Sequence, residues 1–236
     1  GLTSFVFDDR FETIGNSAFL NCVSLTSVTI GQNLISSIST SGTITYATSV
    51  FSGCTNLSSV TIAEGVTKII SSAFENCTAL KSVYALGADG VVRGEEGKTT
   101  FPESLTGIGT NAFKGTGFTI FTLPANVNSL ESGAFANCTA LKSVVLPETI
   151  DDISGTLFEG CTALESVTLP AGVTQIYNGA FNGCTAIREF VIPASIANVV
   201  SPFAGWTAEQ TIYIAVSEAE TLQWWNANWR DDCNAK

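Results

Sequence analysis

Short segments in which apolar and polar residues alternate recur along the whole chain. In LESVTL, which begins at Leu164, Val167 and Leu169 alternate with Ser166 and Thr168. A period of two is typical of a strand that buries one face, because successive side chains point to opposite sides. The chain is therefore predicted to form many short strands. Equivalent segments begin at Leu2, Leu25, Leu57, Leu80, Phe118, Leu141 and Ile187, and a degenerate copy, TIYIAV, begins at Thr211.

A phenylalanine recurs at nearly constant spacing between these segments. Successive steps are 32, 23, 39, 22, 23, 23 and 22 residues, so the unit has 23 residues and two steps contain insertions, near 35–49 and 86–104. We expect the first insertion to be a loop or a small added strand. The second carries a turn signal at Asp89–Gly90 and is expected to be a loop or an irregular hairpin projecting from one edge. The anchors are Phe19, Phe51, Phe74, Phe113, Phe135, Phe158, Phe181 and Phe203.

One 23-residue unit cannot bury its own apolar side, so units stacked in parallel are expected to share a continuous core. Nine strands spaced by ~4.8 Å would form a ladder about 38 Å long. The anchoring phenylalanines and a V-x-x-I segment are predicted to fill the core from the opposite, convex wall. Proline or glycine ends the strands, where the chain must turn. Residues 1–216 are therefore predicted to form one solenoid without linkers.

The last residues, 217–236, are predicted to form a helical cap over the final coil. Ser217 and Glu220 have the spacing of a capping box, and a solenoid needs its last coil covered. A tryptophan cluster can also stack on sugar rings, and Trp224, which lies beside the apolar face, would be the residue involved. The apolar face of this helix would consist of Leu222, Trp225 and Trp229.

The repeat closely resembles the BspA-like, or Treponema pallidum-type, class of leucine-rich repeats, whose unit has the form AFxxCxxLxxVxLPxxVxxI. The resemblance covers nearly the whole chain. It implies a right-handed leucine-rich repeat solenoid of about eight to nine coils, with a parallel β-sheet on its concave face. The residues that carry the match include AFENCTALKSV (73–83), AFANCTALKSVVLPETI (134–150), LFEGCTALESVTLPAGVTQI (157–176) and AFNGCTAIREFVIP (180–193).

Six of the seven cysteines occupy one repeat position, three residues after the phenylalanine. Equivalent side chains on neighbouring coils would lie one rung, ~4.8 Å, apart, whereas a disulfide prefers Cβ atoms ~3.8 Å apart and zinc needs converging ligands. We therefore expect a ladder of buried free thiols that pack as small apolar groups. Thr116 and Trp206 fill the same position in two units. Cys233 is out of register and is either free or paired with a part of the protein outside this sequence. The six are Cys22, Cys54, Cys77, Cys138, Cys161 and Cys184.

Charge and composition exclude several classes of function. The net charge of −11 disfavours nucleic acid and anionic membrane surfaces. The chain has no histidine, which removes Ser-His and Cys-His catalysis and histidine metal sites. No apolar run is long enough to span a membrane. A calcium site at Asp89, Glu95 and Glu96 lacks the spacing of an ion-binding loop. We predict no enzyme activity, no metal and no cofactor.

The side chains that alternate with the core residues are expected to line the concave face. Most are serine or threonine, which suit a solvated sheet surface without any further role. Tyr84 and Ile120 interrupt them, and are interpreted as lying on adjacent strands and forming an exposed apolar patch. Alternatively, the 86–104 insertion folds back over them. The candidate ligand-binding residues are Ser59, Thr61, Ser82, Tyr84, Ile120, Thr122, Ser143 and Val145.

These features favour a non-catalytic binding module. The resemblance implies a secreted or cell-surface protein, often of host-associated bacteria, that binds extracellular proteins or other cells. We predict adhesion to an extracellular or host protein by a monomeric domain. The alternatives are a polysaccharide-binding repeat domain and an architectural spacer. GLTSFVF begins in mid-repeat, so any signal peptide or anchor is expected to lie outside this sequence.

Overall fold

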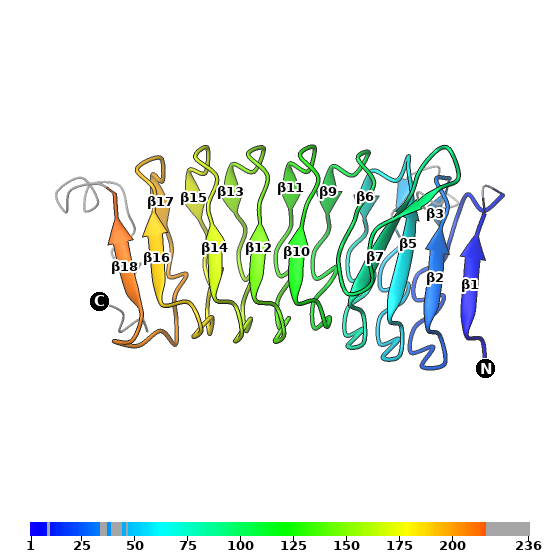
Figure 1. Ribbon diagram of the computed structural model, residues 1–236, viewed down its shortest axis with the longest axis horizontal. Coiled ribbons are helices and arrows are strands. Elements are labelled where there is room, and N and C mark those ends of the chain that lie inside the picture. Colours follow the sequence, from blue (N-terminus) through cyan, green and yellow to red (C-terminus); the bar gives the residue numbers. More distant parts are fainter. Residues whose placement is uncertain (9, 34–36, 39–43, 46, 216–236) are drawn as a thin grey trace.

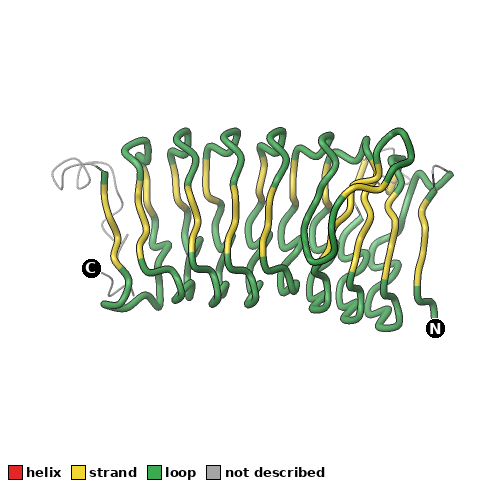
Figure 2. The backbone as a smooth tube through the Cα atoms, in the orientation of Figure 1, coloured by secondary structure: helices red, strands yellow, loops and turns green. Residues whose placement is uncertain are grey.

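The computed structural model describes residues 1–8, 10–33, 37–38, 44–45 and 47–215. These residues form short strands and no helix. The strands lie in two rows along one elongated solenoid (Figure 1), and turns connect the rows in every coil (Figure 2). The leucine-rich repeat solenoid predicted from the sequence is confirmed. The predicted helical cap, 217–236, and Cys233 lie outside the described residues.

The front row contains the nine strands expected from the alternating segments. Within three groups of these strands, neighbours pair in parallel and in register; for example, Val28, Val60 and Val83 occupy equivalent positions on three consecutive strands. These three valines are buried, and the residues on either side of each face outward. The strands are β1 (Ser4–Phe7), β2 (Ser27–Ile30), β5 (Ser59–Ala63), β7 (Ser82–Leu86), β10 (Ile120–Thr122), β12 (Ser143–Val145), β14 (Ser166–Thr168), β16 (Glu189–Ile192) and β18 (Thr211–Ile214).

The back row consists of two-residue strands, each of which supplies one apolar side chain to the core. The inward residue is the isoleucine of the V-x-x-I segment or its equivalent, such as Ile69 and Ile108, both buried. The prediction that this segment fills the core from the opposite wall is confirmed. The strands are β6 (Lys68–Ile69), β9 (Gly107–Ile108), β11 (Ser129–Leu130), β13 (Asp152–Ile153), β15 (Gln175–Ile176) and β17 (Asn198–Val199).

The anchoring phenylalanines form one stack through the solenoid. Ring centroids of neighbours lie 5.4 to 6.1 Å apart. From Phe51 to Phe203 the rings are nearly parallel, with interplanar angles of 5° to 21°. Such offset aromatic pairs add about 0.5–1.5 kcal/mol each beyond the area that they bury. The repeat therefore stabilises every coil through its two neighbours.

Two backbone positions beside each phenylalanine adopt left-handed conformations. Around Phe74 these are Ser72, with φ 53°, and Asn76, with φ 60°. Glycine and asparagine reach this region most readily, which explains the consensus Gly or Asn two residues after the phenylalanine. Serine or threonine at the earlier position adopts the same conformation at a steric cost.

The side chain at the cysteine position of the repeat donates a hydrogen bond. Each of five buried thiols donates to the carbonyl oxygen of the phenylalanine in the preceding coil, over 3.0 to 3.2 Å. Trp206, at the same position, donates through Nε1 to the Phe181 oxygen at 2.9 Å. Thr116 is also buried, and its hydroxyl donates to the oxygen of Phe113 in its own coil. The buried thiols therefore form hydrogen bonds between coils, in addition to packing as small apolar groups. The donors are Cys54, Cys77, Cys138, Cys161 and Cys184.

The described part of the shorter insertion contains two strands. They are β3 (Ser37–Ile38) and β4 (Ile44–Thr45), and they pair with each other in antiparallel orientation. Residues 34–36, 39–43 and 46, in and beside this insertion, lie outside the described residues.

The longer insertion adds chain to the front row without adding a coil. The ring centroids of Phe74 and Phe113 lie 5.5 Å apart, as elsewhere in the stack, although 39 residues separate them. The chain continues from β7, reverses, and returns as β8 (Val92–Arg93), antiparallel to β7. Thr99 then pairs in parallel with Val83, and its hydroxyl accepts a hydrogen bond from the Thr122 amide at 3.2 Å.

The returning segment of the insertion therefore separates β7 from β10. The interpretation that Tyr84 and Ile120 lie on adjacent strands is wrong, because the segment around Thr99 occupies the edge of β7 that β10 would otherwise pair with. In Figure 1 the inserted chain crosses the front row beside β7, and a wider interval follows before β10. We refer below to the inserted residues 87–98 as the inserted hairpin.

Candidate functional site

The outward-facing residues of the front strands form two columns, which together we call the front face. Strand register places the residues of one column on successive strands, as for Ser59 and Ser82 or Thr122 and Val145. The first column is Ser4, Ser27, Ser59, Ser82, Ile120, Ser143, Ser166, Glu189 and Thr211. The second column is Val6, Thr29, Thr61, Tyr84, Thr122, Val145, Thr168, Val191 and Tyr213.

The structure divides the eight candidate residues into two groups of four. Strands β5 and β7 carry one group, in which Ser59 pairs with Ser82 and Thr61 with Tyr84. Strands β10 and β12 carry the other, in which Ile120 pairs with Ser143 and Thr122 with Val145. Since the insertion lies between β7 and β10, the two groups form separate surfaces.

The inserted hairpin covers part of the first group. Ser82 is only 4% exposed, and its hydroxyl accepts a hydrogen bond from the Gly97 amide at 2.8 Å. Tyr84 is half-buried, with Gly94 against its ring: a Cβ on that glycine would stand 3.0 Å from the tyrosine Cδ1. The hairpin thus uses two glycines to approach the sheet closely.

An ion pair helps to hold the hairpin in shape. The Arg93 guanidinium contacts the Asp89 carboxylate at 2.6 Å. Its hydrogen bonds, followed by one from the Val91 amide, lower the pKa of Asp89 to about 2. The pair is exposed, so its contribution to stability is small.

A hollow of about 220 Å³ remains between the hairpin and the strands. It combines hydroxyl, ammonium, carboxylate and aromatic groups in one place, which is unusual on a face otherwise dominated by serine and threonine. Its lining residues are Ser58, Ser59, Ala79, Lys81, Ser82, Tyr84, Glu96 and Gly97.

Two residues of the second group belong to an exposed apolar row. They are Ile120, in the first column and 50% exposed, and Val145, in the second column and 57% exposed. Beyond Thr168 of β14, the second column continues with Val191 and Tyr213, which are 59% and 49% exposed. Sequence reasoning did not select these last two as site residues. Their signal was visible, because both occupy the outward position where most other units have threonine. We call Ile120, Val145, Val191 and Tyr213 the C-terminal apolar row.

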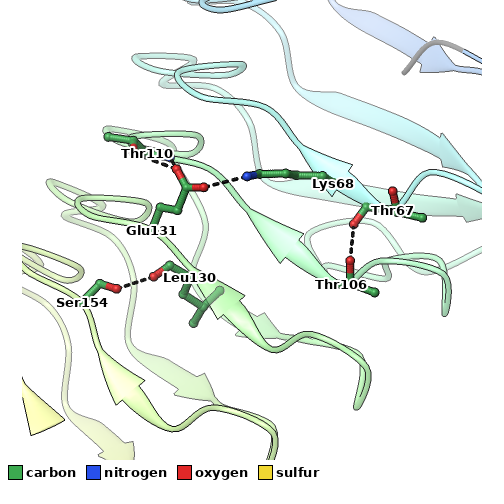
Figure 3. A network of polar contacts seen from close by, with 7 residues as sticks. All are labelled: Thr67, Lys68, Thr106, Thr110, Leu130, Glu131 and Ser154. Carbon is green, nitrogen blue, oxygen red and sulfur yellow. Dashed lines mark hydrogen bonds and ion pairs between the residues drawn. The ribbon is translucent and has the colours of Figure 1, made fainter. Parts of the chain in front are cut away.

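A polar network on the back wall has a structural role (Figure 3). The Lys68 ammonium contacts Glu131 Oε1 at 2.7 Å, while Oε2 accepts hydrogen bonds from the amide and the hydroxyl of Thr110, both at 2.9 Å. Gly107 lies between Lys68 and Ser129 in the strand register, so the lysine reaches past a residue without a side chain. The network ties three coils together and satisfies all its charged groups.

Within the residues that the structure describes, no cluster of acidic and cysteine side chains has the arrangement of a metal site. The same part of the chain contains no helix with the length and hydropathy needed to cross a membrane.

Comparison with solved structures supports the fold. A leucine-rich repeat protein from Treponema pallidum is 27% identical, with a TM-score of 0.62, over 78% of this chain and 77% of the other. A leucine-rich repeat protein from Bacteroides ovatus is 21% identical, with a TM-score of 0.60, over 89% of this chain. This chain spans 56% of the Bacteroides protein. None of the curated proteins matches it.

The sequence also matches a family profile, the BspA type leucine rich repeat region, in 6 copies over residues 1–85 and 97–203. The unmatched interval, 86–96, is most of the inserted hairpin, so the hairpin is an addition to the family pattern. The profile indicates a protein-binding repeat module and no catalytic family. Since the match covers most of the chain and the fold agrees with it, this protein belongs to the BspA-type leucine-rich repeat family.

Proposed function

We propose that the chain is the non-catalytic binding module of a secreted or cell-surface protein, and that it adheres to an extracellular or host protein through the C-terminal apolar row. The observation that carries the proposal is the exposure of four large apolar side chains on the C-terminal part of one rigid face, two on β10 and β12 and two on β16 and β18. Exposed apolar groups are usually scattered, and several large ones gathered on one part of a surface mark a contact site. Tyrosine is also a favoured anchor at protein interfaces.

The rigidity of the surface favours binding. The row stands on strands whose inward residues are part of one continuous core, so little conformational entropy is lost when a partner docks. Val145 and Val191 are β-branched and have few rotamers, which lowers that cost further. Solenoids commonly present such extended surfaces to protein partners. The acidic charge of the chain, −11, favours a partner with a basic surface around its apolar contact.

The test is binding to immobilised extracellular-matrix proteins by a Val145→Asp/Val191→Asp double variant. Both side chains are exposed, so the fold should tolerate the change. A matched control, Val6→Asp/Thr29→Asp, adds the same charge to the second column on the other side of the insertion. We expect the first variant to lose at least tenfold in affinity and the control to bind as the unmodified chain does.

Equal loss in both variants would mean that charge alone weakens binding, and the apolar row would have no special role. Retained binding in both would move the contact to another surface. If the unmodified chain binds none of the proteins, the alternative of an architectural spacer gains support. Melting temperatures of all variants, together with size-exclusion chromatography, check that neither folding nor the expected monomeric state has changed.

A further inference from the structure

We propose that the hollow beneath the inserted hairpin binds one ring of a neutral saccharide. This site is separate from the C-terminal apolar row and does not depend on the function proposed for that row. Its volume, about 220 Å³, lies below the ~300–1,000 Å³ of pockets for drug-sized ligands. One sugar ring, with the rest of a glycan leaving through the open side, suits a hollow of this size.

The charged groups of the hollow are available to a ligand. In the part of the chain that the structure describes, the other charged groups of the hairpin are paired, Arg93 with Asp89 and Lys98 with Glu95. Glu96 takes part in none of the described ion pairs, and neither does Lys81, which also lines the hollow. Both side chains are solvent-exposed and can turn toward a bound molecule.

The lining chemistry matches a sugar better than an ion. A sugar hydroxyl donates one hydrogen bond and accepts others, so it can donate to Glu96, accept from Lys81 and do either with Ser59. The opposite charges of Lys81 and Glu96 cancel, and each would repel one sign of charged ligand. The half-buried ring of Tyr84 offers an apolar surface on which the C–H groups of a sugar can pack.

The hollow is a specific feature of one coil. Leu141-Lys142-Ser143-Val144 repeats the sequence Leu80-Lys81-Ser82-Val83, but no hairpin lies over it. Consequently Ser143 is half-exposed, whereas Ser82 is buried and bonded to Gly97. The close approach requires glycine at residue 94, whose φ is +125° and whose added Cβ would crowd Tyr84. The hairpin therefore gives an ordinary repeat surface a second wall.

The experiment is a binding screen on an oligosaccharide array, followed by titration of any oligosaccharide that binds. The array carries neutral oligosaccharides built from glucose, galactose, mannose and N-acetylglucosamine, together with acidic and basic ones. The test variants are Lys81→Ala and Glu96→Gln. Their controls are Lys142→Ala, at the same repeat position two coils away, and Glu95→Gln, at the neighbouring hairpin residue. We expect each test variant to weaken binding about tenfold, which corresponds to the loss of one charged hydrogen bond. Each control should leave it unchanged.

Saturation-transfer NMR gives a second readout. The ring protons of the bound sugar should receive magnetisation from Tyr84, and this transfer should be lost in the Tyr84→Leu variant. The proposal is overturned if no oligosaccharide binds, or if the test and control variants bind alike. It is also overturned if an acidic or basic oligosaccharide binds better than every neutral one. The Val145→Asp/Val191→Asp variant should keep full saccharide binding, so failure of this proposal and failure of the protein-binding proposal are distinguishable.

Discussion

The thiol of Cys138 donates a hydrogen bond to the carbonyl oxygen of Phe113 in the preceding coil, across 3.2 Å. The same relationship links cysteine and phenylalanine in four other coils. It indicates what this repeat position requires: a buried residue that carries a donor hydrogen, as cysteine, Thr116 and Trp206 all do. Alanine can be buried there but has no donor hydrogen.

If the position requires a donor hydrogen, Thr should be more stable than Val at residue 161 and less stable than Val at residue 144. At Cys161, which donates to the oxygen of Phe135, Thr should be more stable than Val by about 1 kcal/mol, because the two have similar volumes and only Thr keeps a donor. At Val144, an inward residue of β12, Thr should be less stable than Val by about 1–3 kcal/mol because a buried hydroxyl lacks a strong acceptor.

Urea unfolding of Cys161→Thr, Cys161→Val and Val144→Thr measures these differences, provided that the m-values stay equal. If Val were as stable as Thr at Cys161, the cysteine position would be a simple apolar filling and the hydrogen bond would have no stabilising role.

Thiol reactivity should follow position along the solenoid. Cys22 lies in the first coil and is half-buried, whereas Cys184 is fully buried. Burial raises the pKa of Cys184 to about 12, so few molecules carry its thiolate at pH 8. Alkylation followed by peptide mass spectrometry should label Cys22 in the folded protein and Cys184 only after unfolding. Rapid native labelling of Cys184 would contradict the buried placement.

The same pKa shift fixes a dependence of stability on pH. The folded state holds the Cys184 proton more tightly than the unfolded state, where the thiol has its ordinary pKa near 9. The stabilising contribution is therefore complete below pH 9 and decreases as the pH rises from about 9 toward about 12. Cys184→Thr should flatten this alkaline decline in the free energy of unfolding, because a hydroxyl does not ionise there.

Serine residues with a left-handed backbone conformation should be stabilised by substitution with glycine. Ser72 has φ 53°, a conformation that costs a non-glycine residue roughly 1–2 kcal/mol. Ser72→Gly should therefore raise the free energy of unfolding by about 0.5 kcal/mol once the added flexibility of the unfolded chain is subtracted. Ser71→Gly is the matched control, since Ser71 is not left-handed, and it should lower stability. The idea fails if both glycines destabilise equally in thermal melts.

Most of the fold followed from the sequence because each repeat combines a period-two strand with a fixed phenylalanine. Val144 and Phe135 each occupy positions whose equivalents are buried in most other coils, so the register of one coil predicts that of the next. The inserted hairpin was harder to predict. Val83 and Thr99 lie side by side in the structure. The sequence alone did not show this pairing. Pro102 was the available signal, because proline follows the strand in several units.

The candidate site was predicted less completely, for a related reason. Alternation identified Ile120 and Val145 as outward-facing, but it did not show that the insertion separates them from Tyr84. Tyr213 was missed because its segment is degenerate, although its outward position matches that of Val191. The hydrogen bond that the cysteine position donates could not be predicted from the sequence either. A signal was present, because Thr116 and Trp206, which replace the cysteine in two units, also carry a donor hydrogen.

The ion pair between Lys68 and Glu131 should stabilise the back wall in a pH-dependent manner. Burial acts most strongly on Glu131 and by itself would raise the pKa of its carboxyl. Hydrogen bonds from Lys68 and Thr110 more than offset that effect, so the pKa is lowered overall. A lowered pKa means that the carboxylate stabilises the fold above the unfolded-state pKa of about 4.3, and that this stabilisation is lost as the pH falls through the folded-state value.

Glu131→Gln should therefore reduce the free energy of unfolding at pH 7 by roughly 0.5–1 kcal/mol, a modest value because both side chains are about one-third exposed. The difference from the unmodified protein should shrink between pH 7 and pH 3, because protonation of Glu131 removes the stabilisation that its carboxylate provides. Glu165→Gln is the control, since Glu165 and Lys142 are exposed and 3.9 Å apart, and it should have little effect at either pH. Urea unfolding at pH 7 and pH 3 decides the matter. A Glu131→Gln deficit that is the same at both pH values would show that the amide disturbs packing and that the charge of Glu131 does not stabilise the wall.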